Sequence, residues 1–363
     1  MFFKHKIFAL IFQFFNLFPL NNKKISFISD SNESFNSNFD FIKNELSKRD
    51  NFLFNIFYKD KFSIKGIYNL ATSKYIFLND NFFPLAFMKL KKETKVLQLW
   101  HAPGAFKKFG ASVIKDENER NMISKISNNT DYLFTSSDNV NKFYQDAFLI
   151  DNNKIKALGV PRIDYFFNNN LDVNKIKNDF YKKYPEAKNK KIVLYAPTFR
   201  DKEEYNHLFN YFNLKEFNDN FSDEYIFTLR LHPKIKKFLN NDFSKNENYI
   251  DLTDYKNEME LLLIADVLIT DYSSIMIEFA TLNKPIIFFT YDYKYYLNND
   301  RGFYFDFKKM VPGPIAENMD QLINTFNNLD FENINNKEFL SYQFNELDGK
   351  SSKRIVDFIL NNE

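Results

Sequence analysis

The feature that most constrains the fold is an abrupt change of pattern near residue 271. An apolar run, Val267 to Thr270, leads into Asp-Tyr-Ser-Ser and then into helical spacing from Ile275 to Leu282. A second apolar run follows at 285–290. This order predicts a strand, a tight polar turn, a helix and a parallel strand, which together form a unit of a doubly wound sheet.

The polar turn has two interpretations. Ser273 and Ser274 stand where the helix begins. A serine there can cap backbone N–H groups, and the helix dipole favours an anion, so the turn could bind phosphate. The alternative is an ordinary βαβ unit with a capped helix, and the local pattern does not decide between them.

Strand-like and helix-like stretches alternate along the rest of the chain. This alternation predicts parallel sheets covered on both faces by helices. Because 363 residues exceed what one hydrophobic core usually spans, two domains are expected. The predicted strands are 24–29, 52–57, 75–78, 96–100, 132–135 and 155–158, followed by 192–195, 225–231, 249–251, 267–270 and 285–290.

The domain boundaries follow from this alternation and from local composition. Residues 21–170 form the first Rossmann-like domain and 185–340 the second, with the polar stretch 168–191 as the linker candidate. Residues 341–363 are predicted to form a helix that returns to the first domain. Residues 1–20 are Phe-rich with a basic start, and their unbroken apolar part is too short to span a bilayer. We expect an interfacial membrane helix there, the alternative being a buried first helix.

Composition excludes several classes of function. The 49 Lys and Arg nearly balance the 47 Asp and Glu, which argues against a nucleic-acid-binding protein. There is no Cys, so disulfides and thiolate metal sites are excluded. No P-loop and no G-x-G-x-x-G motif occurs, which disfavours P-loop kinases and nicotinamide enzymes. No group of His, Asp and Glu has metal-ligand spacing, so no metal site is predicted.

Chemically capable side chains recur just after the predicted strands. Open α/β sheets bind ligands at the carboxyl ends of their strands, so these residues indicate a functional site. Two such sheets facing each other would bring them to one cleft. The residues are His101, Ser136, Ser137, Arg162, Thr198, Arg200, His232, Ser273 and Ser274.

The two histidines in this set have a chemical and a structural interpretation. His101 lies on a turn with Pro103 and Gly104. A neutral imidazole there can take a proton from a hydroxyl near pH 7, whereas a lone His is more often structural. Arg230 and His232 alternate with leucines at the end of a strand, which suits cationic groups directed at a phosphate or simply an exposed strand face.

Taken together, these motifs resemble the CDP-glycerol glycerophosphotransferase family, which makes teichoic acids and related capsule polymers. The resemblance runs from about Leu20 to Ile315 and rests on DVLITDYSSIMIEFA, KPIIFFTYD, NNDRGFYFDF and PGP. It implies a GT-B-like fold of two Rossmann-type domains, the first on the acceptor side and the second binding the CDP-alditol. It also implies peripheral work on the cytoplasmic face of the membrane.

The resemblance implies roles for particular residues. His101 matches the proposed general base, although the turn after it departs from the family pattern. His232, with Arg230, matches a second functional His that contacts the donor pyrophosphate. The positions that match substrate-binding residues are Ala102, Pro103, Gly104, Ala105, Arg162, Pro197, Thr198, Arg230, Leu231, Ser273, Ser274 and Glu278.

The implied reaction moves glycerol phosphate, or another alditol phosphate, from CDP-glycerol or CDP-ribitol to a hydroxyl of a lipid-linked saccharide or polymer, with release of CMP. The family's larger polymerases carry an extra N-terminal region, and its absence here favours a short-transfer or capsule role. Two alternatives stay open. One is a GT-B glycosyltransferase that uses a nucleotide sugar, and the other is a non-catalytic scaffold of the same pathway.

Overall fold

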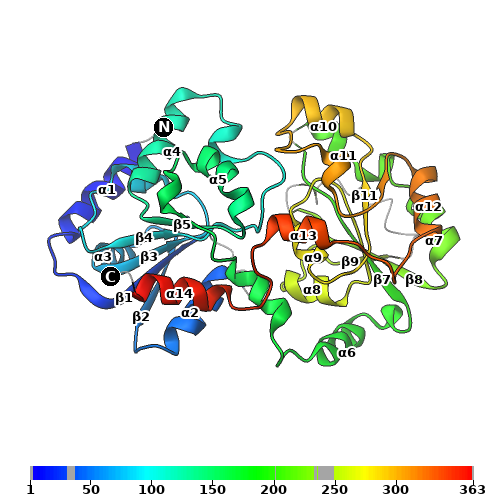
Figure 1. Cartoon of the computed structure of the whole chain (residues 1–363), viewed down its shortest axis with the longest axis horizontal. Coiled ribbons are helices and arrows are strands. Elements are labelled where there is room, and N and C mark those ends of the chain that lie inside the picture. The colour runs from blue at the N-terminus through cyan, green and yellow to red at the C-terminus, as the bar shows by residue number, and fades with distance from the viewer. Residues whose placement is uncertain (1–2, 31–36, 201, 233–234, 236–248, 362–363) are drawn as a thin grey trace. The chain divides into compact units, whose positions relative to one another are not determined.

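The computed structural model describes residues 3–30, 37–200, 202–232, 235 and 249–361. It divides into two compact units, one of residues 1–167 with 342–363 and the other of residues 168–341 (Figure 1). Each unit is built around a six-stranded sheet in which every described pairing is parallel. The predicted α/β class is therefore confirmed.

The sheet of the first unit, called unit 1, is apolar on both faces, because successive apolar side chains of a strand point to opposite faces. Ile25 and Phe27 of β1 join a core with helices α2 (Asn38–Ser47) and α14 (Ser351–Asn361). Ile28 joins a separate core with α1 (Phe3–Phe15) and α3 (Ile64–Ala71). The strand order is β2 (Leu53–Tyr58), β1 (Asn21–Ser29), β3 (Ser73–Leu78), β4 (Lys95–Gln98), β5 (Tyr132–Phe134) and β6 (Ile155–Lys156).

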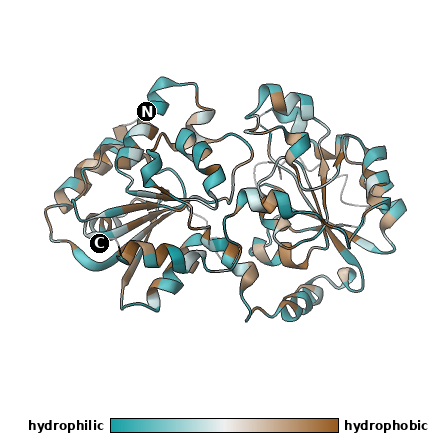
Figure 2. Ribbon diagram, in the orientation of Figure 1, coloured by the Kyte–Doolittle hydropathy of each residue, from teal (hydrophilic) through white to brown (hydrophobic). Residues whose placement is uncertain are grey.

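The second unit, called unit 2, has the same kind of sheet, and its strands are coloured mostly brown, as apolar residues, in Figure 2. The strand order is β12 (Ile315–Ala316), β11 (Ile286–Phe289), β10 (Val267–Thr270), β7 (Lys191–Ala196), β8 (Tyr225–Leu229) and β9 (Tyr249–Asp251). The remaining α-helices are α4 (Glu117–Asn128), α5 (Asn141–Phe148), α6 (Val173–Lys183), α7 (Leu214–Phe221), α8 (Glu258–Ile264), α9 (Ile275–Ala280), α10 (Tyr293–Asn299), α11 (Phe307–Met310), α12 (Met319–Asn327) and α13 (Lys337–Gln343).

Each predicted strand is present, with small differences at the ends. The strand predicted over 96–100 stops at Gln98 because Trp100 has a φ of 58°, which an extended strand cannot accommodate. Strand β12 was not predicted, because its two residues stand between Pro314 and Glu317 and form no longer apolar run. The polar linker candidate contains α6, whose Phe180 is 1% exposed, so this stretch has a helix that packs on the fold.

The first helix has two apolar faces. Phe8, Ala9 and Phe12 are buried against unit 1. The opposite face and the residues that follow carry a row of exposed apolar side chains: Phe3, Ile7, Leu10, Phe14, Leu17 and Phe18. Among the described residues, no helix is long and apolar enough to cross a bilayer.

In both sheets the first strand in sequence lies between two later ones. Strand β1 lies between β2 and β3, and β7 lies between β10 and β8. The direction of winding reverses at such a strand, and ligands of doubly wound sheets bind outside the carboxyl ends at this point. The candidate site residues follow strands at or next to these positions.

Candidate active site

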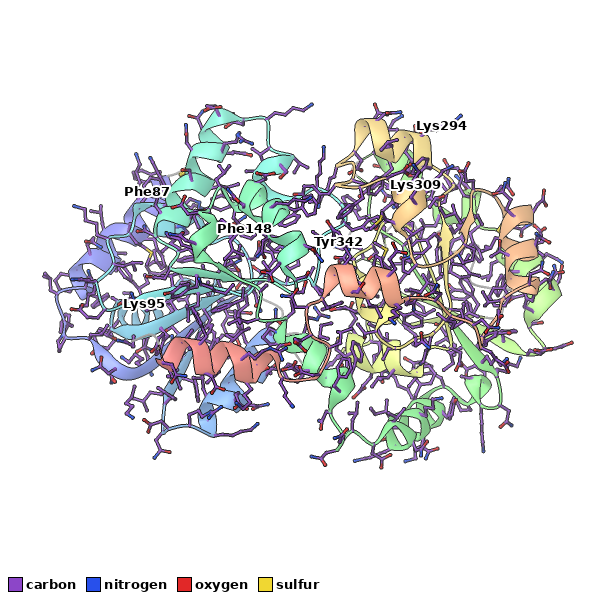
Figure 3. All side chains as sticks on the ribbon, viewed as in Figure 1. Phe87, Lys95, Phe148, Lys294, Lys309 and Tyr342 are labelled. Atoms are coloured by element: carbon purple, nitrogen blue, oxygen red, sulfur yellow. The ribbon has the colours of Figure 1, made fainter. Side chains whose placement is uncertain are left out.

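The chain makes a strained turn directly before His101. Trp100 has a φ of 58°, an uncommon value for a residue other than glycine that costs about 1–3 kcal/mol. Its N–H donates to Oε1 of Gln98 at 2.9 Å, and Nδ2 of Asn38 donates to its carbonyl at 2.7 Å. Phe148, labelled in Figure 3, packs edge-on against the indole at 5.0 Å. These contacts maintain a conformation that places the next residue, His101, at the carboxyl edge of the sheet.

The tautomer of His101 follows from the one hydrogen bond described for its imidazole ring. Nδ1 lies 3.3 Å from the carbonyl oxygen of Asn79, just after β3. A carbonyl only accepts, so a neutral His101 carries its hydrogen on Nδ1 and has a lone pair on Nε2. The imidazole lies against Trp100, with ring centroids 4.0 Å apart, and the residue is exposed to solvent. Nε2 can therefore accept a proton.

The surroundings lower the pKa of His101 from its ordinary value. The main cause is the protein packed around the ring, which reduces hydration of the imidazolium although the residue is solvent-accessible. The carboxylate of Asp80 and the carbonyl of Asn79 oppose this shift, while the guanidinium of Arg162 adds to it. The imidazole is therefore neutral at pH 7, as a general base requires.

Asn38 connects the turn of His101 to Arg162. Its Oδ1 accepts from the backbone N–H of Arg162 at 2.9 Å, while its Nδ2 donates to Trp100 as described above. Nη1 of Arg162 in turn donates to the carbonyl of His101 at 3.2 Å. Asn38 is 2% exposed. Two predicted site residues of unit 1, His101 and Arg162, are thus brought together through a residue that the sequence did not indicate.

The residues after His101 shape the turn. Gly104 has a φ of 61°, and its N–H donates to Oγ of Ser136 at 2.9 Å. The N–H of Ala105 donates to Oε1 of Gln343 at 3.0 Å. Pro103, Gly104 and Ala105 are buried and Ala102 is half-buried, so the fold uses most of this predicted substrate-binding segment to support His101.

In unit 2, the ends of β7 and β10 are joined by one carboxylate. Asp271 accepts from the N–H of Thr198 at 2.8 and 3.0 Å and from the N–H of Tyr272 at 2.5 Å. Oγ1 of Thr198 is buried and has no hydrogen-bond partner among the described residues, as suits a position that receives a polar ligand group. Pro197 is buried beneath it.

Arg200 is not available to a ligand, contrary to the prediction from its place after a strand. It is 0% exposed, and Nε and Nη2 donate to the two oxygens of Asp292 at 2.7 and 2.9 Å. Nη1 donates to Asp271 at 2.7 Å. Burial alone would lower the pKa of Arg200, but the two carboxylates outweigh it and the pKa is raised. Arg200 therefore links the segments that follow β7, β10 and β11.

The serine turn after β10 differs from its prediction in one respect. Ser274 is the N-cap of α9, but its side chain forms no capping hydrogen bond. Instead, Oγ of Ser273 accepts a long bond of 3.4 Å from the N–H of Ile275. Glu278 lies one turn further along α9 and is 3% exposed. Both serines are half-buried at the carboxyl edge.

In the segment after β8, Arg230 and Leu231 contact the rest of unit 2, whereas His232 is exposed to solvent. Nη1 of Arg230 donates to the carbonyl of Tyr255 at 2.9 Å, and Leu231 is buried in the core. His232 is exposed, with its ring 5.8 Å from that of Phe199, the residue after Thr198. His232 and Thr198 therefore lie on neighbouring loops. The last residue of the LRLHP motif, Pro233, lies outside the described residues.

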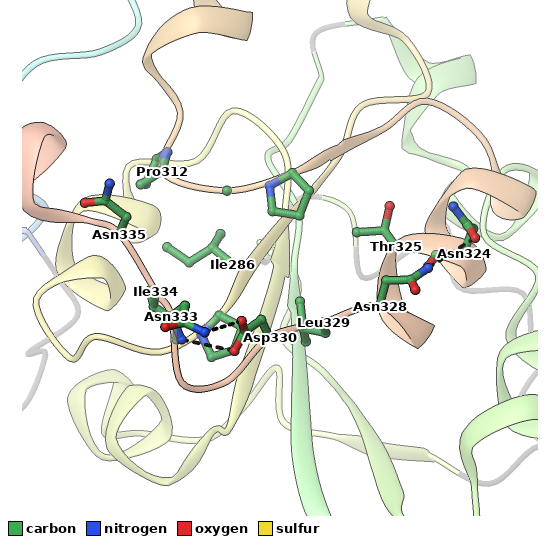
Figure 4. A pocket seen from close by; sticks show the side chains of 13 residues that line it. Ile286, Pro312, Asn324, Thr325, Asn328, Leu329, Asp330, Asn333, Ile334 and Asn335 are labelled. Atoms are coloured by element: carbon green, nitrogen blue, oxygen red, sulfur yellow. Dashed lines mark hydrogen bonds between the residues drawn. The ribbon is translucent and has the colours of Figure 1, made fainter.

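A separate cavity of about 540 Å³ in unit 2 lies away from these residues (Figure 4). It is lined by Pro285 and Pro314, which precede β11 and β12, and by asparagines such as Asn324 and Asn328. It therefore belongs to the amino ends of the strands, opposite the predicted site. Within the part of the chain that the structure describes, no group of three His, Cys, Asp or Glu could hold a metal ion.

Several curated relatives are similar to this chain over most of its length. A teichoic acid poly(ribitol-phosphate) polymerase of Bacillus spizizenii is 38% identical over 98% of this chain, and the match spans 59% of that protein's length. A teichoic acid glycerol-phosphate primase of Bacillus subtilis is 34% identical over 82% of this chain and 76% of its own.

Solved structures and the family profile agree with these relatives. The wall teichoic acid polymerase TagF matches with a TM-score of 0.81, covering 99% of this chain and 93% of its own at 22% identity, which supports the GT-B-like fold. The profile described as CDP-glycerol:poly(glycerophosphate) glycerophosphotransferase matches residues 10–361. The chain therefore belongs to this family of glycerophosphotransferase enzymes.

Proposed function

We propose that this protein transfers an alditol phosphate, glycerol phosphate or ribitol phosphate, from a CDP-alditol to a hydroxyl of a membrane-linked acceptor in teichoic acid or capsule synthesis. The observation that carries this proposal is the state of His101. Its Nδ1 faces a carbonyl, its Nε2 keeps a lone pair, and its pKa is lowered, so it is equipped to remove a proton.

In the proposed reaction, Nε2 of His101 takes the proton of the acceptor hydroxyl. The hydroxyl oxygen then bonds to the β-phosphorus of the CDP-alditol, and the bond from that phosphorus to the bridging oxygen breaks. CMP leaves with the electron pair. Such a transfer depends on positioning and on stabilising the charge of the phosphate oxygens. Arg162, which contacts the backbone of His101, is placed to contribute positive charge.

The residues of unit 2 are proposed to hold the donor. Thr198, Ser273 and Ser274 offer hydroxyls at the switch point of the sheet, and His232 lies on the loop next to Thr198. Arg230 is partly exposed, and its guanidinium lies 3.7 Å from the carboxylate of Glu258. Its positive charge is therefore partly compensated before a donor binds.

We further propose that His232 protonates or shields the leaving phosphate. A donor with a better leaving group should then restore more activity to His232→Ala than to His101→Ala. Equal restoration would show that His232 has no part in departure of the leaving group.

Membrane contact is proposed through the exposed apolar row of α1. Leu10 is 70% exposed and Phe14 is 60% exposed, next to Lys4 and Lys6, which matches a helix that lies in a membrane interface. Phe14→Ser should weaken co-sedimentation with anionic vesicles, whereas Leu297→Ser, at an exposed apolar residue of unit 2, should not. Equal sedimentation of both variants and wild type would remove this role.

The test of the function is CMP release from CDP-glycerol and CDP-ribitol with a lipid-linked saccharide acceptor. Release from one donor that collapses in His101→Ala is expected and would also identify the alditol. Turnover of UDP-sugars without CMP release would instead support the glycosyltransferase alternative. If a CDP-alditol bound with the same affinity to wild type and His101→Ala but was not turned over with any acceptor, the non-catalytic scaffold would be supported.

A further inference from the structure

A second cavity, of about 550 Å³, opens in unit 1. One wall is α1, and the others are the segments that follow β2 and β3. These two strands flank β1, the strand at which the winding of the sheet reverses. The cavity therefore lies where doubly wound sheets bind ligands, although none of the predicted site residues lines it.

The floor of this cavity is aromatic. Phe8, Phe57 and Phe82 pack edge-on with centroid distances of 5.5, 5.4 and 5.9 Å. Two further phenylalanines line it with exposed side chains, Phe62 at 67% and Phe83 at 38%. Large apolar side chains that remain exposed around a hollow are typical of a site that takes an apolar ligand.

The same cavity carries positive charge. Lys4, Lys59 and Lys61 line it together with Asp60. Lys59 is paired with Asp30 at 3.1 Å and with Asp80, so the positive charge offered to a ligand comes mainly from Lys4 and Lys61. Lysine ammonium groups bind phosphates well, so the combination suits a ligand with an apolar chain and an anionic end. Oδ1 of Asn81 is buried there without a hydrogen-bond partner among the described residues, and as an acceptor it matches a ligand hydroxyl.

The cavity connects two features already described. Ile7 belongs both to its lining and to the exposed apolar row of α1. At its other side, Lys59 pairs with Asp80 at 3.5 Å, and the carboxylate of Asp80 acts on the pKa of His101. Asn79, which accepts from His101, is two residues before Asn81. A ligand that enters from the membrane side would thus extend toward the proposed base.

We propose that this cavity binds the lipid-phosphate end of the acceptor. The hydrocarbon next to the phosphate would pack on the phenylalanines, the phosphate groups would contact the lysines, and the sugar beyond them would reach His101. This inference rests on the function proposed above, because it assigns the acceptor's place in that reaction.

The direct probe is farnesyl diphosphate, a short water-soluble chain with two phosphates, titrated by calorimetry. We expect it to bind, to compete with the lipid-linked acceptor and to leave CDP-alditol binding unchanged. Farnesol and inorganic diphosphate should each bind more weakly than the joined molecule, because each retains one half of the contacts. Displacement of farnesyl diphosphate by the CDP-alditol would place it in the donor site and overturn the proposal.

Two rim substitutions test the location. Lys61→Glu and Phe62→Glu change exposed side chains, so both variants should fold, with an unchanged melting temperature as the check. Each should weaken farnesyl diphosphate binding and raise the KM for the lipid-linked acceptor about tenfold, with the donor Kd unaltered. Lys65→Glu is the matched control, since Lys65 is exposed on α3 and does not line the cavity. Equal binding by all three variants would overturn the proposal.

One more variant separates this site from general adhesion to membranes. Leu17→Ser, in the exposed row, should weaken vesicle binding and leave binding of farnesyl diphosphate in solution intact; loss of both would refute a separate cavity site.

The two proposals can also fail separately. CMP release without farnesyl diphosphate binding would refute the acceptor site alone. Binding that depends on Lys61 and Phe62, without CMP release from any donor, would refute the proposed function alone.

Discussion

The two units present polar residues at the carboxyl edge of a parallel sheet, but they hold those residues by different means. In unit 1 the turn of His101 is held mainly by hydrogen bonds with the neutral side chains of Asn38, Ser136 and Gln343, to which Arg162 adds one bond. In unit 2 the ends of three strands are held by one arginine between two aspartates, all buried. In the proposed reaction, His101 changes its charge, whereas the residues of unit 2 stay fixed and hold the donor.

This contrast has a physical reason. Hydrogen bonds with neutral side chains fix the turn without adding a strong field at the imidazole, so the pKa of His101 is set mainly by burial, Asp80, Asn79 and Arg162. A donor pyrophosphate brings two negative charges, so its site benefits from a rigid frame whose own charges are already compensated. In unit 2, Arg200 is buried between Asp271 and Asp292, and the hydroxyls proposed to bind the donor lie at the edge of the sheet.

The largest effect is expected from breaking the ionic frame of unit 2. Arg200→Met leaves two buried carboxylates without their cation and should lower the free energy of unfolding by about 3–5 kcal/mol, measured by urea denaturation. Lys202→Met is the control, because Lys202 pairs with Glu204 at the surface and should change little. Equal stability of Arg200→Met and wild type would contradict the structural role of Arg200.

The next largest effect is expected at Asn38, whose two hydrogen bonds clamp the backbone of Trp100 to that of Arg162. Asn38→Ala removes two buried hydrogen bonds at 2.7 and 2.9 Å and should cost about 1–3 kcal/mol of stability. It should also lower kcat with little change in donor Kd, because Trp100 and Arg162 lose their link.

Asn129→Ala is a matched control for this clamp. Its amide also joins two loops of unit 1, donating to the carbonyls of Leu85 and Met88, away from His101. Asn129→Ala should lower the free energy of unfolding but keep the wild-type kcat, measured at a temperature at which the variant is fully folded. If both variants lost kcat alike, Asn38 would have no positioning role.

The smallest effect is a shift in the pH profile. The value of kcat/KM should fall as pH decreases through the His101 pKa, which lies below the ordinary value of 6.5. Arg162→Gln removes a cation that disfavours the imidazolium, so the pKa rises and the acid limb moves to higher pH. Asp80→Asn removes an anion and should move the limb to lower pH. A limb that moved the same way in both variants would show that another group titrates.

The fold could be predicted because the sequence alternates strand and helix patterns throughout, and strand ends carry unusual polar residues. His101 was predicted as a candidate in this way. The same rule failed at Arg200, whose partners Asp271 and Asp292 lie 71 and 92 residues further along the chain, so nothing local shows that it is buried. Asn38 gave no signal either, since it is one asparagine among many and its partner Trp100 is 62 residues away.

In the proposed reaction, unit 1 supplies the base and unit 2 holds the donor. The most direct test measures, for wild type and His101→Ala, both the Kd of the CDP-alditol and the rate of CMP release. The account predicts an unchanged Kd with a rate that is lower by about 10²–10⁴. A wild-type rate in His101→Ala, or a loss of donor binding that accounts for the whole loss of rate, would contradict it.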